Sequence, residues 1–302
     1  KKFLKQDPAF LNTPSWMWKT WKETYGIPYC RQIATAHLTQ PALDLTVKSN
    51  PEFWAKKLNA RILPTGTLRI SNNGKIQDLT GFKEGAWWVQ DTAASIPARV
   101  LIASLQNYKK PKILDLCAAP GGKTAQLATS LKCVIAVDRS KSRTKLLKEN
   151  MKRLNLTVKI ITGDITNYKP SNLVDGILLD APCTATGTIR RHPDILHNKQ
   201  PEDVLRLAKI QLELLKAAVE FLKPDAILIY SVCTLQPEEG PRVIQKILSL
   251  RDKLKRVPID PLEFGLPQSA QTRTGDLRTL PFHLGKLGGM DGFYISRLKL
   301  VS

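Results

Sequence analysis

Residues 112–123 have the sequence KILDLCAAPGGK, an apolar segment that runs directly into a loop of small residues. The apolar half, KILDL, is typical of a buried strand. Small side chains in the second half let the backbone approach a ligand, and in open α/β sheets ligands bind at the carboxyl ends of the strands. We therefore expect a ligand to lie against this loop, which comprises Cys117, Ala118, Ala119, Pro120, Gly121, Gly122 and Lys123.

After Trp87, apolar strand candidates alternate with helical stretches. The strand candidates are KILDL (112–116), VIAVD (134–138), VKIIT (158–162), DGILLD (175–180), AILIYSV (226–232) and a late strand at 293–300. The helix candidates are 123–131, 140–154, 201–222 and 237–250. Such alternation is typical of a parallel sheet covered by helices. We predict a doubly wound, Rossmann-like α/β domain over residues 88–302.

A helical segment is expected at the start of the chain, over residues 1–40. Within it, residues 14–25 place Trp18 and Trp21 three positions apart, which puts both rings on one face of a helix. Gly26 is expected to end that helix.

Residues 41–87 form a second unit before the large domain. They contain the short strand-like pieces LDLTV, RILPTG, TLRI and KIQDL around a helix candidate at 51–58. This pattern predicts a small α+β module. It is either an RNA-contacting platform or a packing domain.

Composition limits the classes of protein that the chain can belong to. The 302 residues carry 46 Lys and Arg against 26 Asp and Glu, a net charge of +20. Such an excess favours a phosphate-rich polymer as partner, although a basic surface can also serve solubility. No apolar run reaches the length of a membrane span, and the first residues lack the apolar core of a signal peptide.

Cysteine usage indicates a reducing, cytoplasmic location. The chain has five cysteines and no CxxC pair, so neither a disulfide framework nor a metal site is predicted. Cys30 and Cys133 are interpreted as small buried hydrophobic residues.

Two acids follow the second and third predicted strands. Asp138 ends the second strand about twenty residues after the loop begins, as expected of a carboxylate that binds ribose hydroxyls. Asp164 follows the third strand and can accept from an adenine amino group, or it can form an Asx turn or helix cap. Together with the loop, these acids predict a nucleoside cofactor.

The fourth and fifth predicted strands bring one acid and two thiols to the same rim of the sheet. The fourth ends in Asp180-Ala-Pro-Cys183, and the fifth in Ser231-Val-Cys233-Thr234. A single strand cysteine is usually a packing residue, but two at successive strand ends beside a cofactor loop favour nucleophilic catalysis.

Four stretches carry a family resemblance: LDLCAAPGGKT, LLDAPCTATGTIRRHPDI, YSVCTLQPEE and DGFYISRL. Together they resemble the Sun/Fmu (RsmB-type) bacterial 16S ribosomal RNA cytosine-5 methyltransferases, from about Pro14 to the C-terminus. The sequence departs from the family at Ser231-Val-Cys233-Thr234, where Thr-Cys-Ser is commoner. Many members carry a further N-terminal domain similar to the antitermination factor NusB, which we expect this chain to lack.

The resemblance implies S-adenosylmethionine as cofactor and RNA, most of all 16S ribosomal RNA, as partner. The loop Cys117–Lys123 would hold the methionine part, with Asp138 on the ribose, Arg143 nearby and Asp164 near the adenine. Cys233 would be the nucleophile that adds to C6 of cytosine, and Cys183 would help to release the product. Asp180, with Lys123 as a second candidate, would stabilise the charge that develops on the base.

Arg190, Arg191 and His192 follow the Asp-Ala-Pro-Cys motif and are expected to contact the RNA backbone, the alternative being a solvated loop. His192 is not assigned a catalytic role. The basic helix at 141–153 is interpreted as a solvated face. Methylation of tRNA and a non-catalytic RNA-binding assembly factor remain alternative functions, and methylation of DNA is disfavoured.

Overall fold

A bent helix leads the described part of the chain. The computed structural model describes residues 7–71 and 74–302. After the short α1 (Pro8–Leu11), α2 covers Ser15–His37 and changes direction at Gly26, where φ is 81°. The predicted break at Gly26 is confirmed, but helix resumes beyond it. Pro28 lies close to the new start, where its missing N–H costs little.

An antiparallel sheet forms the small module. Its strands are β1 (Leu43–Val47), β2 (Arg61–Ile62), β3 (Leu68–Ile70) and β4 (Trp87–Val89), in the order β2-β3-β1-β4, with α3 (Pro51–Lys57) packed beside them. The α+β prediction holds, but KIQDL is wrong as a strand because Ile76–Asp78 forms a 3-10 helix. β4 ends at Val89, so the small module extends two residues beyond the boundary predicted at residue 87.

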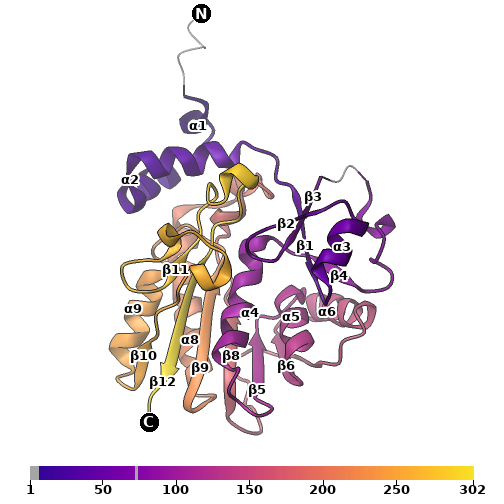
Figure 1. The fold of residues 1–302 in the computed structure, drawn as a ribbon. Helices are drawn as coiled ribbons and strands as arrows, with labels where there is room; N and C mark the ends of the chain where they lie inside the picture. The colour runs from indigo at the N-terminus through magenta and orange to yellow at the C-terminus, as the bar shows by residue number, and fades with distance from the viewer. Residues whose placement is uncertain (1–6, 72–73) are drawn as a thin grey trace, which may run out of the picture.

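The large sheet has a parallel centre and an antiparallel edge (Figure 1). Its strands are β5 (Lys112–Leu116), β6 (Cys133–Asp138), β7 (Lys159–Thr162), β8 (Val174–Asp180), β9 (Leu222–Val232), β10 (Leu254–Arg256), β11 (Leu277–Arg278) and β12 (Tyr294–Leu300). The order is β10-β12-β9-β8-β5-β6-β7, with β11 paired to β12. The predicted strands are confirmed. β12 is antiparallel to β9, β10 and β11, a direction that the sequence did not reveal.

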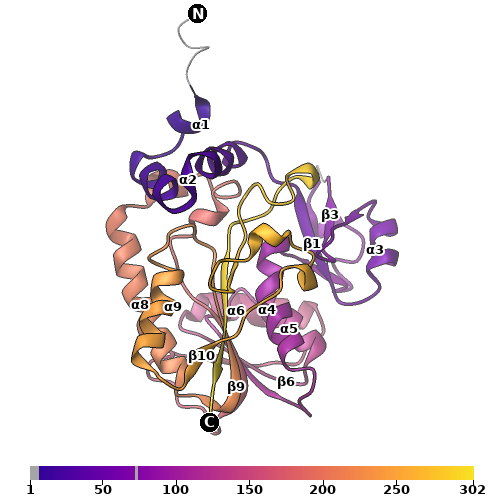
Figure 2. The ribbon, with the colours of Figure 1, turned by 60° about the vertical axis from the view of Figure 1, so that its left-hand side comes forward.

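Helices cover both faces of this sheet, which confirms the doubly wound prediction (Figure 2). One face carries α4 (Thr92–Ser104), α5 (Gly122–Ser130) and α6 (Lys141–Arg153). The other carries α8 (Pro201–Val219) and α9 (Pro241–Leu250), and the short α7 (Ile195–Asn198) precedes α8. Strand side chains alternate between the two faces: Ala136 packs toward α6, whereas Val137 belongs to the core under α8 and α9.

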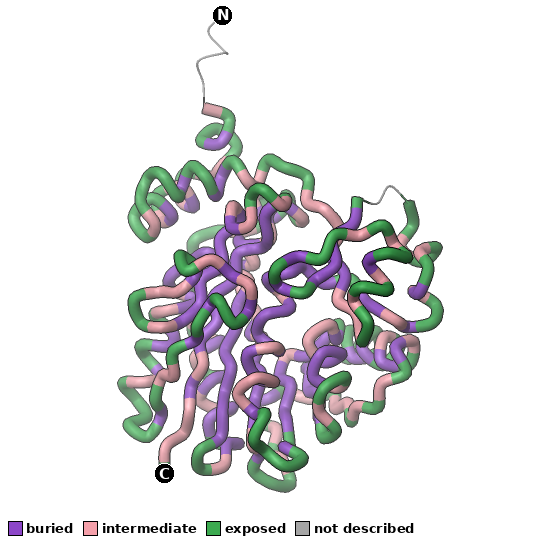
Figure 3. Tube along the Cα trace, viewed as in Figure 1, coloured by how far each residue is buried: buried purple, intermediate pink, exposed green. Residues whose placement is uncertain are grey.

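The chain reverses its direction across the sheet between β5 and β8. From β5 it proceeds through β6 to β7, and it then returns to β8 on the other side of β5. A crevice at the carboxyl ends of the strands forms at such a switch point. Figure 3 shows that β5 and β8, the strands on either side of this switch point, are buried along most of their length. Side chains that can meet a ligand therefore lie at the ends of these strands.

The N-terminal helix covers the loops that follow β8 and β9. Met17 and Trp21 are fully buried and pack with Ile189 and Leu235 from those loops. The Tyr25 hydroxyl donates to the Leu235 carbonyl at 2.6 Å. The helical segment is therefore part of the wall behind the cysteine-bearing loops. Among the residues described, no helix is long and apolar enough to cross a membrane.

Candidate active site

The loop between β5 and α5 adopts backbone conformations that few residues tolerate. Cys117 has φ of 60° and Gly121 has φ of 107°, and the peptide between Ala119 and Pro120 is cis. A Cβ on Gly121 would lie 2.4 Å from Leu147 Cδ1 in α6, so only glycine fits. Backbone held in such sparsely populated conformations clusters at ligand and active sites.

Asp138 holds this loop from the end of β6. Its carboxylate is 2% exposed and accepts from the Ala119 N–H at 3.1 Å and the Ser140 N–H at 2.9 Å. Arg143 Nη1 lies 3.9 Å from the same carboxylate, and its guanidinium also donates to the Ala119 carbonyl. Since two carboxylate oxygens offer about four acceptor positions, Asp138 keeps capacity for hydroxyl donors.

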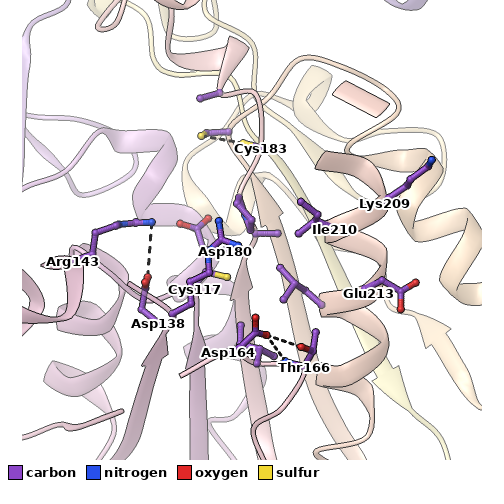
Figure 4. Close-up of a pocket in the computed structure, with 17 residues that line it drawn as sticks. Cys117, Asp138, Arg143, Asp164, Thr166, Asp180, Cys183, Lys209, Ile210 and Glu213 are labelled. Atoms are coloured by element: carbon purple, nitrogen blue, oxygen red, sulfur yellow. Dashed lines mark hydrogen bonds and ion pairs between the residues drawn. The ribbon is translucent and has the colours of Figure 1, made fainter. Parts of the chain in front are cut away.

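A cavity of about 510 Å³ opens beside the loop, at the carboxyl ends of the central strands (Figure 4). Polar groups and apolar side chains alternate along it. Its walls include Cys117, Asp138, Arg143, Asp164, Ile165, Asp180, Cys183, Ile210, Leu214 and Cys233. A second hollow of about 210 Å³ lies along Ala118–Pro120 and shares Cys117 and Asp180 with the first. All of the predicted cofactor residues except Gly121 therefore line one or both of these adjoining hollows.

Asp164 forms the Asx turn that the sequence allowed, and it also lines the cavity, where an adenine could lie. Its Oδ1 accepts from the Thr166 N–H at 2.9 Å and from the Thr166 hydroxyl at 2.7 Å, which is an Asx turn. These hydrogen bonds hold the pKa of Asp164 below its usual value. The residue also lines the large cavity, so the turn fixes a carboxylate at its rim.

The two thiols at the ends of β8 and β9 are in contact. Cys183 Sγ and Cys233 Sγ are 3.5 Å apart, and both side chains are partly buried. The hydrogen bond with Cys233, burial and the charge of Glu239 together raise the pKa of Cys183 well above that of a free thiol. The two thiols therefore form a sulfur–sulfur hydrogen bond in which either sulfur can be the donor.

Asp180 lies beside the thiols in an ion pair with Lys123. Lys123 Nζ donates to Asp180 Oδ2 at 2.7 Å, and the Ser231 hydroxyl donates to Asp180 Oδ1 at 2.7 Å. Burial lowers the pKa of Lys123, but the Asp180 carboxylate outweighs it and leaves that pKa raised. The ammonium also lies 5.1 Å from the centre of the Phe293 ring. Lys123 is thus held as a cation beside Asp180 and near Cys233.

Burial argues against the predicted contact of Arg190 with the RNA backbone, whereas the same contact of Arg191 stays a prediction. Arg190 is 1% exposed and pairs with Asp91 at 2.8 Å and Asp291 at 2.9 Å. Arg191 is 21% exposed and pairs with the same two carboxylates. Two buried acids need cationic partners, and these arginines supply them. His192 is exposed, so its contact with RNA remains a prediction.

Other sequence interpretations have mixed outcomes. Cys30 is buried as expected, but Cys133 is exposed at the first position of β6, where the strand enters the sheet. The helix at 141–153 is largely solvated, although Arg153 donates to the Phe82 and Trp87 carbonyls and so anchors the module. Within residues 7–71 and 74–302, no cluster of His, Cys, Asp and Glu is suited to hold a metal.

Several residues of the site were not identified from the sequence. The wall opposite the loop comes from α8, through Lys209, Ile210, Glu213 and Leu214. This is an ordinary helix face and carries no motif. Glu239, by contrast, lies in the quoted stretch YSVCTLQPEE, where a second acid after the nucleophile motif was an available signal.

The crevice fits S-adenosylmethionine, the cofactor that the sequence resemblance implies. A buried carboxylate with free acceptor capacity suits ribose hydroxyls, and the apolar side chains of Ile165, Ile210 and Leu214 suit a flat purine ring. Asp138 and Asp164 both line this cavity.

Comparisons with known proteins agree with this site. The family model described as 16S rRNA methyltransferase RsmB/F matches residues 102–299. Ribosomal RNA small subunit methyltransferase B of Vibrio cholerae is 35% identical over 86% of this chain, and a probable methyltransferase of the same name from Synechocystis is 33% identical over 95%. The chain spans 62% and 66% of the length of these two relatives.

A solved structure shows the same fold over nearly the whole chain. A methyltransferase homologue from Pyrococcus horikoshii superposes with a TM-score of 0.79 and 23% identity, covering 98% of each chain. The family model covers both strands that end in the paired thiols, as well as the loop Cys117–Lys123. From these matches and the site they cover, the chain belongs to the RsmB/F family of 16S rRNA methyltransferases.

Proposed function

We propose that this chain transfers a methyl group from S-adenosylmethionine to C5 of a cytosine in RNA, with 16S ribosomal RNA as the expected substrate. The contact of Cys183 and Cys233 at 3.5 Å, beside the Lys123–Asp180 ion pair, is the observation that carries the proposal. Two thiols in contact next to a cofactor crevice suit a reaction in which one sulfur adds to the substrate and is later expelled.

The reaction begins with Cys233, because C5 of cytosine is a poor nucleophile on its own. The thiolate forms a bond to C6 and pushes electron density onto C5. Asp180 and Lys123, which form an ion pair with each other, would hydrogen-bond the edge of the base and stabilise the charge that develops. The target base must leave any stack or pair to reach this crevice.

When bound, S-adenosylmethionine would supply an electrophilic methyl group on a positively charged sulfur, and transfer of that methyl group to C5 would leave the neutral thioether S-adenosylhomocysteine. The C5 proton must then be removed before the bond between Cys233 and C6 breaks and the thiolate leaves. Cys183 is the group beside Cys233 that can assist this elimination, as a base or through its own thiol. In the crevice, the loop Cys117–Lys123 would hold the methionine part, Asp138 the ribose and Asp164 the adenine.

A methyl-transfer assay with labelled cofactor tests the proposal. Purified chain is incubated with 16S ribosomal RNA or with tRNA, and the label that enters each RNA is measured. Label in the ribosomal RNA supports the proposal, and label in tRNA alone would favour the tRNA alternative. Cofactor binding without label in either RNA would support an RNA-binding assembly factor.

A cytoplasmic location remains a prediction.

Asp138→Ala is expected to weaken S-adenosylmethionine binding by roughly 10- to 150-fold, because a charge-assisted hydrogen bond contributes about 1.5–3 kcal/mol. Titration calorimetry measures the change. Asp252→Ala serves as control, since Asp252 is exposed in the turn between α9 and β10. Unchanged affinity in Asp138→Ala would contradict the assignment of Asp138 to the ribose.

RNA binding is expected to weaken steeply with salt, because the net charge of +20 favours contacts with phosphates. Each phosphate contact adds a slope of roughly −0.7 to −0.9 to the plot of log K against log salt concentration. Fluorescence anisotropy at several salt concentrations measures the slope. A flat plot would leave the basic surface as a solubility feature.

A further inference from the structure

A buried carboxylate lies behind the two thiols and has no part in the chemistry proposed above. Glu239 is fully buried in the turn between β9 and α9. Its Oε1 accepts from the Thr184 N–H at 2.8 Å and from Gln211 Nε2 at 3.1 Å. Its Oε2 accepts from the hydroxyls of Thr184 at 2.5 Å and Thr234 at 2.7 Å.

The two threonines that donate to Glu239 each directly follow a cysteine of the site. Thr184 follows Cys183 on the loop after β8, and Thr234 follows Cys233 on the loop after β9. One carboxylate therefore joins the two cysteine-bearing loops. It does so one residue from each cysteine, and neither Glu239 nor the two threonines line the cavity.

Further hydrogen bonds tie the same two loops together. The Thr186 hydroxyl lies 3.0 Å from the Thr234 hydroxyl and accepts from the Leu235 N–H at 2.9 Å. The Gly187 N–H donates to the Cys233 carbonyl at 3.0 Å. Glu239 is the only acid in this set of contacts, so it is the member whose loss leaves several buried donors without an acceptor at once.

The polar network extends from Glu239 to the motif that carries Cys183. Gln211 in α8 donates to the Pro182 carbonyl at 2.8 Å as well as to Glu239. The Tyr230 hydroxyl donates to the Glu239 carbonyl at 2.6 Å. With four donors on two oxygens, the carboxylate has its acceptor positions filled, and it has no free lone pair with which to act as a base.

We infer that Glu239 is a positioning residue that holds Cys183 and Cys233 at the separation which the proposed methyl transfer requires. The inference rests on the proposed function for its catalytic consequence, but the thiol geometry itself can be measured without RNA or cofactor. Because a displacement of about 1 Å at a reacting group can cost 10²-fold in rate, a modest loosening of either loop has a large effect.

Thiol cross-linking tests the geometry. Dibromobimane, which becomes fluorescent when both of its arms react with thiols, is added to the purified chain, and the bridged peptide is identified by mass spectrometry. The wild type is expected to bridge Cys183 and Cys233, and Glu239→Ala to do so several-fold more slowly. Glu238→Ala is the matched control, because this neighbour makes a partly exposed ion pair with Arg242. Cys183→Ser must abolish the bridge.

Single-turnover methyl transfer tests the consequence. Glu239→Ala is expected to lower the rate constant by roughly 10- to 100-fold, with the affinity for S-adenosylmethionine unchanged. Glu239→Gln should recover most of the rate, since its amide oxygen can accept from the two N–H donors while its NH₂ group donates to the threonine hydroxyls. A merely structural residue would alter cofactor binding and thermal stability along with the rate.

The outcomes separate this inference from the proposed function. Wild-type rate and bridging in Glu239→Ala would overturn the inference. If that variant does not fold, Thr184→Val and Thr234→Val replace it, and each must slow bridging. Normal bridging in both would likewise overturn the inference. A wild type that bridges its thiols but methylates no RNA would contradict the proposed function instead.

Discussion

Cys233→Ala is expected to lower methyl transfer to RNA by about 10⁴-fold or more, because it removes the only group assigned to form the bond to C6. The variant should still bind S-adenosylmethionine, since Asp138 and the loop that it holds are unaffected. Methyl incorporation into RNA and calorimetry with the cofactor measure the two effects.

The control for this variant is Cys133→Ala. Cys133 is exposed at the start of β6, at the opposite end of the sheet strands from the thiol pair, and its loss should leave the rate unchanged. Methyl transfer that survives in Cys233→Ala would remove Cys233 from the role of nucleophile.

Cys183→Ala is expected to trap the enzyme on its substrate. Cys183 acts after methyl transfer in the proposed order, so its loss leaves the bond between Cys233 and C6 intact while elimination is slowed by roughly 10²- to 10⁴-fold. A denaturing gel with RNA and cofactor should show a band that migrates above the free protein.

The double variant is the control for the trapped band. Cys183→Ala combined with Cys233→Ala should form no such band, because the sulfur that bonds to C6 is absent. If Cys183→Ala traps nothing while Cys233→Ala does, the two roles are reversed and the nucleophile lies in the Asp-Ala-Pro-Cys motif.

The large sheet and the contents of its crevice could be predicted from the sequence because local rules determine them. A buried parallel strand is a continuous apolar run, and the carboxyl ends of such strands meet at one edge whatever connects them. Asp138 and Cys233 could therefore be assigned to the same rim, because Asp138 is the last residue of β6 and Cys233 directly follows β9.

Other features depend on tertiary partners that no local pattern reveals. α4 has the sequence TAASIPARVLIAS, which lacks an amphipathic period because the helix is buried between the sheet and α5. Arg190 resembles a surface cation in sequence, but its partners Asp91 and Asp291 come from positions about 100 residues away. No local pattern reveals the role of Glu239 either, because its donors lie on the loop after β8, on α8 and on the loop after β9.

Release of tritium from C5 is the most direct test of the central claim, that this chain methylates C5 of cytosine in RNA. RNA made with tritium at C5 of cytosine is incubated with the chain and S-adenosylmethionine carrying a ¹⁴C methyl group. The account predicts that tritium enters water in one-to-one proportion with methyl groups entering RNA, since the C5 hydrogen must leave for each transfer. Methyl incorporation without tritium release would contradict it.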